Sequence, residues 1–457
     1  MPIATTDPRT GKVLKTFDEL TEEQLEDKLS RAAAAAATYR TTSFEEREGW
    51  LRAAADILDK RTDELAELMT LEMGKTKKAA AAEVGKCAAA LRFYADHARE
   101  FLADEVVDAS SVNASKAYAR YLPIGVVLAI MPWNFPLWQA MRFAAPALAA
   151  GNVGLLKHAS NVPQVALFME ELFRDAGFPD DVFSTLLIGS SKVEKVIQDD
   201  RVAAATLTGS EGAGVSVGRT AGESLKKVVL ELGGSDAFVV MPSADLAKAA
   251  KVATTSRCQN NGQSCISAKR FIVHAAVADR FEELFAAKLA ALVVGDPMDE
   301  KTDVGPLSTS DGRDDVEELV ADAVGKGARV VVGGSRVDGP GWFYPPTLIT
   351  GITPEMRMYR EEVFGPVAAL YRVPDLDAGI ALANDVDFGL GANIWTNDEA
   401  ERERFVRDAQ AGMVFVNGMV TSYPQLPFGG VKDSGYGREL TDLGMHEFMN
   451  AKTVWIN

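Results

Sequence analysis

The segment QNNGQSCISAKRF, residues 259–271, places Cys265 in a small polar turn just ahead of an apolar, strand-like run. Soluble chains usually bury cysteines among apolar side chains. Here Gly262, Gln263 and Ser264 surround the sulfur instead. A thiol in such a turn can act as a nucleophile if its pKa is lowered and a substrate can reach it. From the residues alone, Cys265 is either a nucleophile or an ordinary half-buried thiol.

A nucleophilic cysteine needs a base, and one carboxylate stands out. Glu231, in VVLELGGSDAF, ends an apolar strand-like run just before two glycines. Partial desolvation would raise its pKa toward the range of a general base, whereas a solvated acid at a strand end is the alternative. The four histidines are His97, His158, His274 and His446. None has metal-ligand or papain-like spacing, so we expect no metal site.

The segment MPWNFPLWQAMRFAAPALAAGN, residues 131–152, carries two more polar side chains in apolar surroundings. Asn134 lies between Trp133 and Phe135, and its amide could donate to an oxyanion. Arg142 is the only charge on an otherwise apolar helical stretch. Because a buried, unpaired guanidinium costs several kcal/mol, Arg142 needs an anion as partner. That partner is either an internal acid or a substrate carboxylate.

A glycine-rich turn suggests a phosphate site. In ATLTGSEGAG a strand-like run is followed by Gly209, Ser210 and Gly214 and then by a helix. Such turns bind phosphate through backbone N–H groups, although this one lacks the G-x-G-x-x-G pattern and is weak evidence alone. Lys157 ends the neighbouring run GNVGLLK. It should lie at the carboxyl edge of a strand, where open α/β sheets bind ligands.

The elements that would hold these side chains alternate along the chain. From residue 124 short β-branched runs alternate with amphipathic helices, and a second series begins after residue 236. This pattern predicts two α/β domains with parallel-type sheets covered by helices on both faces. Residues 21–106, including six alanines at 32–37, predict packed helices. The C-terminal TVWIN predicts a last strand that pairs with residues 115–121 in a small β-arm.

Composition narrows the functional class. A chain of 457 residues should fold as two or three domains. Its net charge of −17 argues against binding to nucleic acid or an anionic membrane. No apolar run is long enough to cross a bilayer. The three cysteines, Cys87, Cys258 and Cys265, form no paired framework, which suits a reducing compartment. We expect a cytoplasmic, unprocessed protein.

Seven motifs occur in an order that resembles the signature set of the aldehyde dehydrogenase superfamily across nearly the whole chain. They are PWNFP, LLKHAS, LTGSEGAG, LELGGSDAF, NNGQSC, EEVFGPV and PFGGVKDSGYGRE. Each motif is modest alone, and the ordered set is highly specific. The resemblance implies a Rossmann-like cofactor domain (1–112 and 124–232), a catalytic domain (233–435) and an oligomerisation arm (113–123 and 436–457). It also implies a homodimer or homotetramer.

The resemblance also implies a role for each chemical group. Cys265 matches the nucleophile that forms a thiohemiacetal with an aldehyde. Asn134, with the backbone N–H of Cys265, matches the oxyanion hole. After hydride transfer to the nicotinamide leaves a thioester, Glu231 matches the base that activates water. The residues that resemble cofactor contacts are Trp133, Lys157, Gly209, Ser210, Glu362 and Phe364.

Two further positions bear on the cofactor and the substrate. NAD-selective members usually carry an acid three residues after the lysine, and Ser160 stands there, which favours NADP while leaving NAD possible. Arg142 and Ser422 fall where succinate-semialdehyde dehydrogenases hold the distal carboxylate. Gln259 replaces a second arginine often found in those enzymes. Ser267 replaces a cysteine that some of them carry, so no thiol–disulfide switch is expected beside Cys265.

The expected activity is therefore the NADP-dependent oxidation of a small aldehyde, with succinic semialdehyde first. Three alternatives stay open: a broad-specificity small-aldehyde dehydrogenase that uses NAD or NADP, a CoA-dependent acylating enzyme, and a non-catalytic binding protein on the same fold. The presence of Glu231 favours hydrolysis over acylation, and the presence of Cys265 together with Glu231 favours catalysis over binding alone.

Overall fold

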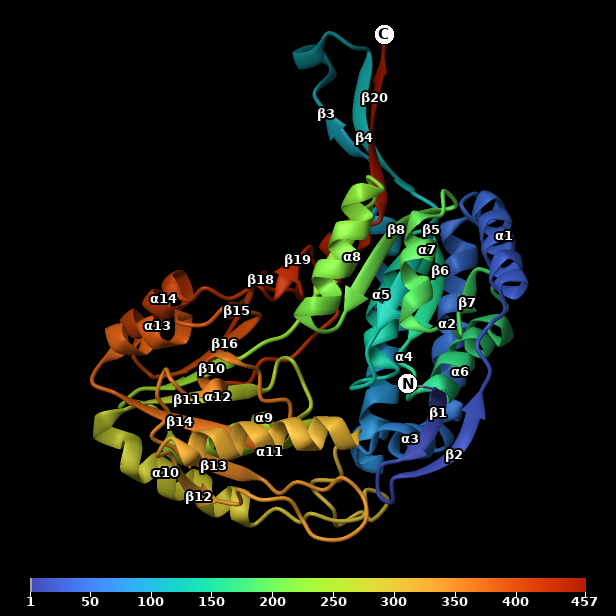
Figure 1. Ribbon diagram of the computed structural model, residues 1–457. Coiled ribbons are helices and arrows are strands. Elements are labelled where there is room, and N and C mark those ends of the chain that lie inside the picture. The colour runs from blue at the N-terminus through green and yellow to red at the C-terminus, as the bar shows by residue number, and fades with distance from the viewer. Residues whose placement is uncertain (1) are drawn as a thin grey trace.

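A six-stranded sheet forms the first large layer of the computed structural model, which describes residues 2–457 (Figure 1). Its strands are β5 (Val126–Met131), β6 (Val153–His158), β7 (Phe183–Thr185), β8 (Val202–Thr208), β9 (Lys227–Glu231) and β19 (Gly435–Tyr436). The order is β19-β9-β8-β5-β6-β7, and all neighbours are parallel except β19 and β9. The strand order reverses between β5 and β8, because β6 and β7 follow on one side of β5 whereas β8 and β9 lie on the other. In such sheets ligands bind beyond the carboxyl ends at that point.

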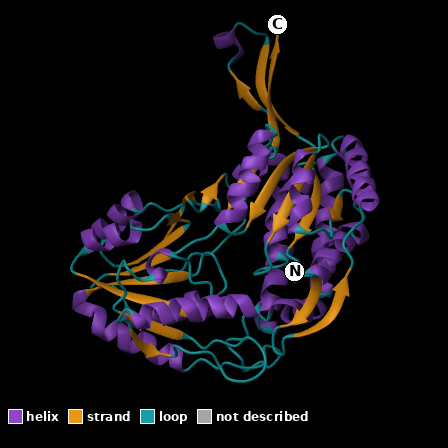
Figure 2. Cartoon of the chain, viewed as in Figure 1, coloured by secondary structure: helices purple, strands orange, loops and turns teal. Residues whose placement is uncertain are grey.

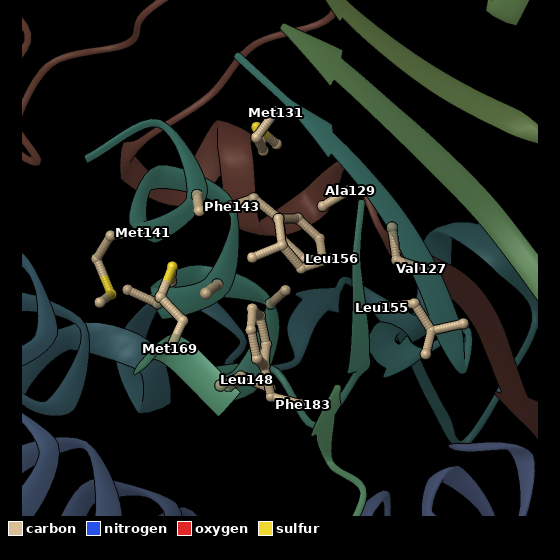
Figure 3. Close-up of a cluster of buried hydrophobic side chains, with 14 of the residues drawn as sticks. Val127, Ala129, Met131, Met141, Phe143, Leu148, Leu155, Leu156, Met169 and Phe183 are labelled. Atoms are coloured by element: carbon tan, nitrogen blue, oxygen red, sulfur yellow. The ribbon is translucent and has the colours of Figure 1, made fainter. Parts of the chain in front are cut away.

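Helices enclose this sheet, as Figure 2 shows. They are α1 (Glu22–Tyr39), α2 (Phe44–Lys60), α3 (Thr62–Met73), α4 (Lys77–Phe101), α5 (Trp138–Ala149), α6 (Pro163–Asp175), α7 (Val193–Gln198) and α8 (Glu211–Glu223). The six alanines expected to be helical lie within α1. Figure 3 shows Leu155 and Leu156 of β6 among the side chains of the core, together with Phe143 and Leu148 of α5. Burying each such side chain contributes about 1.5–3 kcal/mol.

A seven-stranded sheet forms the second layer, in the order β12-β13-β14-β11-β10-β16-β17. Its strands are β10 (Asp236–Val240), β11 (Ala268–His274), β12 (Arg329–Val332), β13 (Thr347–Thr350), β14 (Val367–Val373), β16 (Gly391–Trp395) and β17 (Met413–Val416). Only the β12–β13 pair is antiparallel. Its helices are α9 (Leu246–Cys258), α10 (Ala275–Ala290), α11 (Ser310–Gly325), α12 (Arg357–Arg360), α13 (Leu376–Asn384) and α14 (Glu399–Asp408).

Both faces of the second sheet are buried, because alternate residues of β10 belong to different cores. Ala237 and Val239 pack in one hydrophobic cluster, and Phe238 and Val240 pack in the other. Successive side chains of a strand point to opposite faces, so a strand that is covered on both sides reads as a continuous apolar run. The expected pair of α/β sheets covered by helices is confirmed.

The C-terminal strand lies in a separate three-stranded sheet that projects from the body of the molecule (Figure 1). Strand β4 (Lys116–Pro123) pairs with both β3 (Glu105–Val107) and β20 (Met449–Ile456), all antiparallel. The expected pairing of the C-terminal residues with residues 115–121 is confirmed.

The expected boundaries of the arm, 113–123 and 436–457, differ from those in the structure. It already begins at β3, and residues 435–446 stay with the body of the protein. Strand β19 pairs with β9, and α15 (Thr441–His446) packs on α4 and α5. The physical reason is that Leu440, Met445 and Phe448 are buried in the core of the first sheet. The sequence did not predict that attachment, because the apolar run in this glycine-rich segment is short.

Two small pairs of strands complete the fold. They are the hairpin of β1 (Ile3–Asp7) with β2 (Lys12–Phe17), and the pair of β15 (Phe388–Gly389) with β18 (Val431–Lys432). Across residues 2–457, none of the helices has both the length and the apolar character needed to cross a bilayer.

Candidate active site

Cys265 lies at the junction of two cavities, of about 290 Å³ and about 80 Å³. It lines both of them, as does Gln139 of α5. We call them the larger and the smaller cavity. A thiol at this position can contact ligands that approach from two sides.

The turn before Cys265 is held in an unusual backbone conformation. Asn260 and Asn261 have positive φ angles of 53° and 57°, and Gly262 has φ 78°. Asparagine tolerates this left-handed region better than most residues. A Cβ on Gly262 would fall 2.3 Å from the carbonyl carbon of Gly365, so only glycine fits this close approach. The sequence thus fixes the loop against the neighbouring segment and sets the position of the sulfur.

The Cys265 thiol does not have the lowered pKa expected of a nucleophile. Burial raises the pKa of Cys265 to about 12, although the positive charges of Arg142 and Lys269 oppose the shift. Burial disfavours the charged thiolate, and here it outweighs both cations. A group that accepts the proton, or a further positive charge, is needed to ionise this sulfur.

Asn134 meets Cys265 at the larger cavity. It follows the carboxyl end of β5, and both residues line that cavity. Its Oδ1 accepts a hydrogen bond from Gln139 Nε2 at 3.2 Å, and its Nδ2 donates to the carbonyl of Gln263 at 3.2 Å. An amide nitrogen carries two hydrogens, so one N–H stays free to donate. The side chain is therefore fixed with a donor to spare beside the cysteine.

Glu231, at the end of β9, is buried but lies outside the lining of both cavities. Its Oε1 has no hydrogen-bond partner among residues 2–457 and lies against the backbone of Gly429, where a Cβ would come within 2.7 Å. Burial and the negative charge of Glu439 raise the pKa of Glu231, and Arg142 opposes this rise. The carboxyl is desolvated, as a base with a raised pKa requires, and its Oε1 lies against Gly429, outside the two cavities that Cys265 lines.

Arg142 has an internal acid as its partner. Its Nε lies 2.7 Å from Oε2 of Glu439, and both side chains are buried. The guanidinium also lies 4.2 Å from the ring centre of Phe428. Arg142 lines the smaller cavity, and neither its Nε nor its Nη2 makes a hydrogen bond among the described residues, so its contact with Glu439 is an ion pair only. Of the two partners considered from the sequence, the internal carboxylate is present.

The smaller cavity brings Ser422 together with a lysine that sequence reasoning missed. Lys86 of α4 lines this cavity with Ser422, Gln259 and Arg142. Its Nζ donates to Ser422 Oγ at 2.7 Å. Lys86 lies three residues after the buried Glu83 and hence beside the buried face of its helix, which only the fold reveals.

The larger cavity lies at the carboxyl ends of β5, β8 and β9, where the strand order reverses. Its lining residues are Pro132, Trp133, Asn134, Gln139, Thr208, Gly209, Ser210, Leu232, Gly233, Cys265, Glu362 and Phe364. Ser210 caps α8, a helix of 13 residues, whose N-terminal N–H groups suit a phosphate. Thr208 Oγ1 is buried with no hydrogen-bond partner in the described chain. This donor set fits the pyrophosphate and ribose of a dinucleotide.

A second missed lysine ties this cavity to the nucleophile. Lys269, at the start of β11, forms an ion pair with Glu362 at 2.9 Å. Its Nζ also donates to the carbonyl oxygens of Ser264 at 2.8 Å and Cys265 at 2.7 Å. A buried lysine in a strand needs such partners. Lys269 therefore fixes Glu362 relative to the cysteine loop.

Lys157 and Ser160 do not line the larger cavity. Lys157 lies in β6, next to β5, and Ser160 follows two residues after that strand. Burial lowers the pKa of Lys157, the charge of Glu19 opposes this shift, and no ion pair within 4.0 Å involves this lysine in residues 2–457. The negative charge of Glu19 acts on this lysine from beyond 4.0 Å, so an anionic group could approach it more closely than that carboxylate does.

Comparison with known proteins identifies the family of this chain. The chain matches the aldehyde dehydrogenase family over residues 1–454. It belongs to that family. It is 59% identical over 456 residues to succinate-semialdehyde dehydrogenase (NADP+) 1 of Mycobacterium tuberculosis, with both chains covered completely. It is 58% identical to the corresponding enzyme of Mycobacterium avium, covering 97% of that protein and all of this chain.

A solved structure supports the same placement. Succinic semialdehyde dehydrogenase from Streptococcus pyogenes, in complex with NADP+, superposes with a TM-score of 0.96 at 41% identity over 99% of each chain. The family and the fold expected from the sequence are both confirmed. Within the described part of the chain no three His, Cys, Asp or Glu side chains cluster in a way that could hold a metal ion.

Proposed function

We propose that this aldehyde dehydrogenase oxidises succinic semialdehyde to succinate with NADP+ as the hydride acceptor. One observation carries the proposal: Cys265 separates a cavity suited to a dinucleotide from a smaller cavity lined by Arg142, Lys86 and Ser422. Positive charge beyond the reacting carbon suits an aldehyde with a distal carboxylate. The names of its relatives, at 58–59% identity, support the same substrate and cofactor.

The residues divide the reaction between them. The Cys265 thiol first gives its proton to water, and its Sγ then attacks the aldehyde carbon. The tetrahedral oxyanion that forms accepts hydrogen bonds from the free N–H of Asn134 Nδ2 and from the backbone N–H of Cys265. Loss of hydride from that carbon leaves a thioester on Cys265. Glu231 accepts a proton from the water that opens the thioester, releasing succinate and the thiol. To do so, the Glu231 side chain turns from Gly429 toward the sulfur.

NADP+ would bind along the carboxyl ends of the first sheet. Gly209 and Ser210 would hold its pyrophosphate, and Trp133, Glu362 and Phe364 would border the nicotinamide end. Lys157 and Ser160 would meet the 2′-phosphate at the adenosine end, because a lysine without a carboxylate partner and a hydroxyl both suit an anion. When bound, the oxidised nicotinamide supplies the hydride acceptor and a positive charge that favours the thiolate.

A spectrophotometric assay tests the proposal. The purified protein is mixed with succinic semialdehyde and NADP+, with and without CoA, and the absorbance of the reduced cofactor is followed. We expect NADPH formation without CoA, and a lower kcat/KM with NAD+. A strict requirement for CoA would make the protein an acylating enzyme, and no reduction with any aldehyde would make it a binding protein.

We also propose that the protein works in the cytoplasm as a homo-oligomer joined through the arm. Support comes from exposed apolar side chains on that sheet, at Val106, Val107, Trp455 and Ile456. A lone three-stranded sheet with exposed apolar residues is typical of a surface that pairs with another chain. Light scattering on the purified chain should give a dimer or tetramer mass, and a monomer mass would contradict the proposal.

A further inference from the structure

The smaller cavity is lined by two cations and no carboxylate. Arg142 comes from α5 and Lys86 from α4, and they stand in different surroundings. An anionic ligand that reached Cys265 through this cavity would meet both side chains. The cation that has no carboxylate partner inside the protein is the better candidate to bind such a ligand.

Arg142 already has a buried counter-charge inside the protein, the carboxylate of Glu439. Its Nε lies 2.7 Å from Oε2 of Glu439, at side-chain exposures of 2% and 6%. Its face is covered by the ring of Phe428. A second anion near this guanidinium would also lie near the carboxylate of Glu439, which would repel it.

Lys86 has no such partner. In residues 2–457 no carboxylate lies within 4.0 Å of its Nζ, which donates to Ser422 Oγ at 2.7 Å and lies 4.3 Å over the ring of Trp138. Glu83, one turn earlier, is not available, because its carboxylate pairs with Lys75 and accepts the backbone N–H groups that open α5. Lys86 is therefore a cation at a cavity wall with two N–H bonds uncommitted.

Ser422 completes a pair of donors. Its Oγ accepts from Lys86 Nζ and, at 3.0 Å, from Trp138 Nε1. A hydroxyl oxygen has two lone pairs and one hydrogen, so both lone pairs are in use. The hydroxyl hydrogen has no acceptor among the described residues and is left to donate. The serine is buried at 3% exposure, so a ligand in the cavity is the acceptor at hand.

We propose that Lys86 and Ser422 hold the distal carboxylate of the substrate, and that Lys86 supplies the positive charge which Arg142, held by Glu439, does not. The inference rests on the proposed function, because it assumes a substrate with a carboxylate. It also explains how the cavity can bind an anion although Gln259, which lines it, is neutral.

Binding of the substrate carboxylate should weaken as the pH rises, because Lys86 loses its proton. Burial and the neighbouring charge of Arg142 lower the pKa of Lys86 to about 8. The other groups that act on it are Cys87, Glu83 and Lys75. Below pH 8 the lysine is charged and binds a carboxylate, and as the pH rises through 8 it loses its proton and the binding weakens. The KM for succinic semialdehyde should therefore rise between pH 7 and pH 9.5, while the KM for butanal should not.

Kinetics of Lys86→Met with two aldehydes test the proposal. Loss of a charge-assisted hydrogen bond should raise the KM for succinic semialdehyde by about 10–100-fold and leave the KM for butanal nearly unchanged. Lys78→Met is the matched control, because it removes the same charge from an exposed position of α4. Lys86→Arg, which keeps its charge at all these pH values, should retain low KM and remove the rise above pH 8.

A second readout separates this proposal from the proposed function. Succinate should inhibit butanal oxidation competitively, and Lys86→Met should raise its inhibition constant by a similar factor. This assay needs no turnover of succinic semialdehyde, so it still tests the lysine if that aldehyde is a poor substrate. Equal losses on both aldehydes would assign Lys86 a structural role. A selective loss in Arg142→Met, with none in Lys86→Met, would return the carboxylate to Arg142.

Discussion

The buried pair of Arg142 and Glu439 allows a quantitative stability prediction. Replacing Glu439 by Leu leaves the guanidinium, 2% exposed, without a counter-charge. Breaking such a pair from one side costs about 3–5 kcal/mol, because the remaining charge stays desolvated. At about 2.1 cal/mol/K per residue, a chain of 457 residues has an unfolding entropy of about 1 kcal/mol/K. Glu439→Leu should therefore lower Tm by about 3–5 °C.

A variant of Arg142, the other member of the pair, tests whether the broken ion pair causes the loss of stability. Arg142→Met should cost a similar amount, because it strands the carboxylate instead. The double variant should recover most of the loss, because two apolar side chains replace a buried ion pair with little penalty. Differential scanning calorimetry on all four proteins gives the coupling energy, which should be about 3 kcal/mol.

Glu45→Gln is the control for this cycle. Glu45 pairs with Arg99 on the surface, with side chains 68% and 62% exposed, so its Tm should not change measurably. If the double variant loses as much as the two single variants added together, Arg142 and Glu439 act independently. That result would refute the argument that Glu439 neutralises Arg142.

Three further predictions concern catalysis. Cys265→Ala should lower aldehyde oxidation by more than about 10³-fold, while the Kd for NADPH, followed by protein fluorescence, stays unchanged; lost cofactor binding would point to misfolding. Because burial and Glu439 raise the pKa of Glu231, this base is protonated at low pH and gains activity as the pH rises. Glu439→Gln removes the like charge, so the acid limb of the kcat profile should move to lower pH, and an unmoved limb would contradict the coupling. Ser160→Glu should shift the kcat/KM ratio of NADP+ to NAD+ toward NAD+ by roughly 10–100-fold through repulsion of the 2′-phosphate, and an unchanged ratio would place the 2′-phosphate elsewhere.

The layers of the fold follow from local patterns that a sequence displays directly. Short β-branched runs separated by amphipathic helices predict buried parallel strands, and β5 to β9 lie where these runs do. The attachment of residues 435–446 to the first sheet could not be read in this way. It depends on β19 pairing with β9 some two hundred residues earlier in the chain, and pairing over such distances leaves no periodic signal.

The residues of the candidate site also fall into those that the sequence predicted and those that only the structure reveals. Cys265 and Asn134 carry recognisable local surroundings, whereas Ser422 was found only through the family resemblance, and the structure places all three at the two cavities. The sequence did not predict Lys86 and Lys269 as site residues, because lysines on helices and strands are usually solvated. Only the packing of the fold shows that these two are enclosed. The raised pKa of the Cys265 thiol has the same origin, because desolvation is a property of the folded environment.

The net charge of −17 argues against some partners and not against others. A nucleic acid or a membrane spreads over the protein surface and meets the summed field of many carboxylates. Succinic semialdehyde and NADP+ are anions as well, but each would bind in a cavity. Salt screens exposed charges over about 8 Å under physiological conditions, whereas a cation at hydrogen-bonding distance in a partly dry cavity is screened much less. Lys86 and Lys157, neither with a carboxylate within 4.0 Å in the described chain, can therefore set the local potential against the sign of the whole protein.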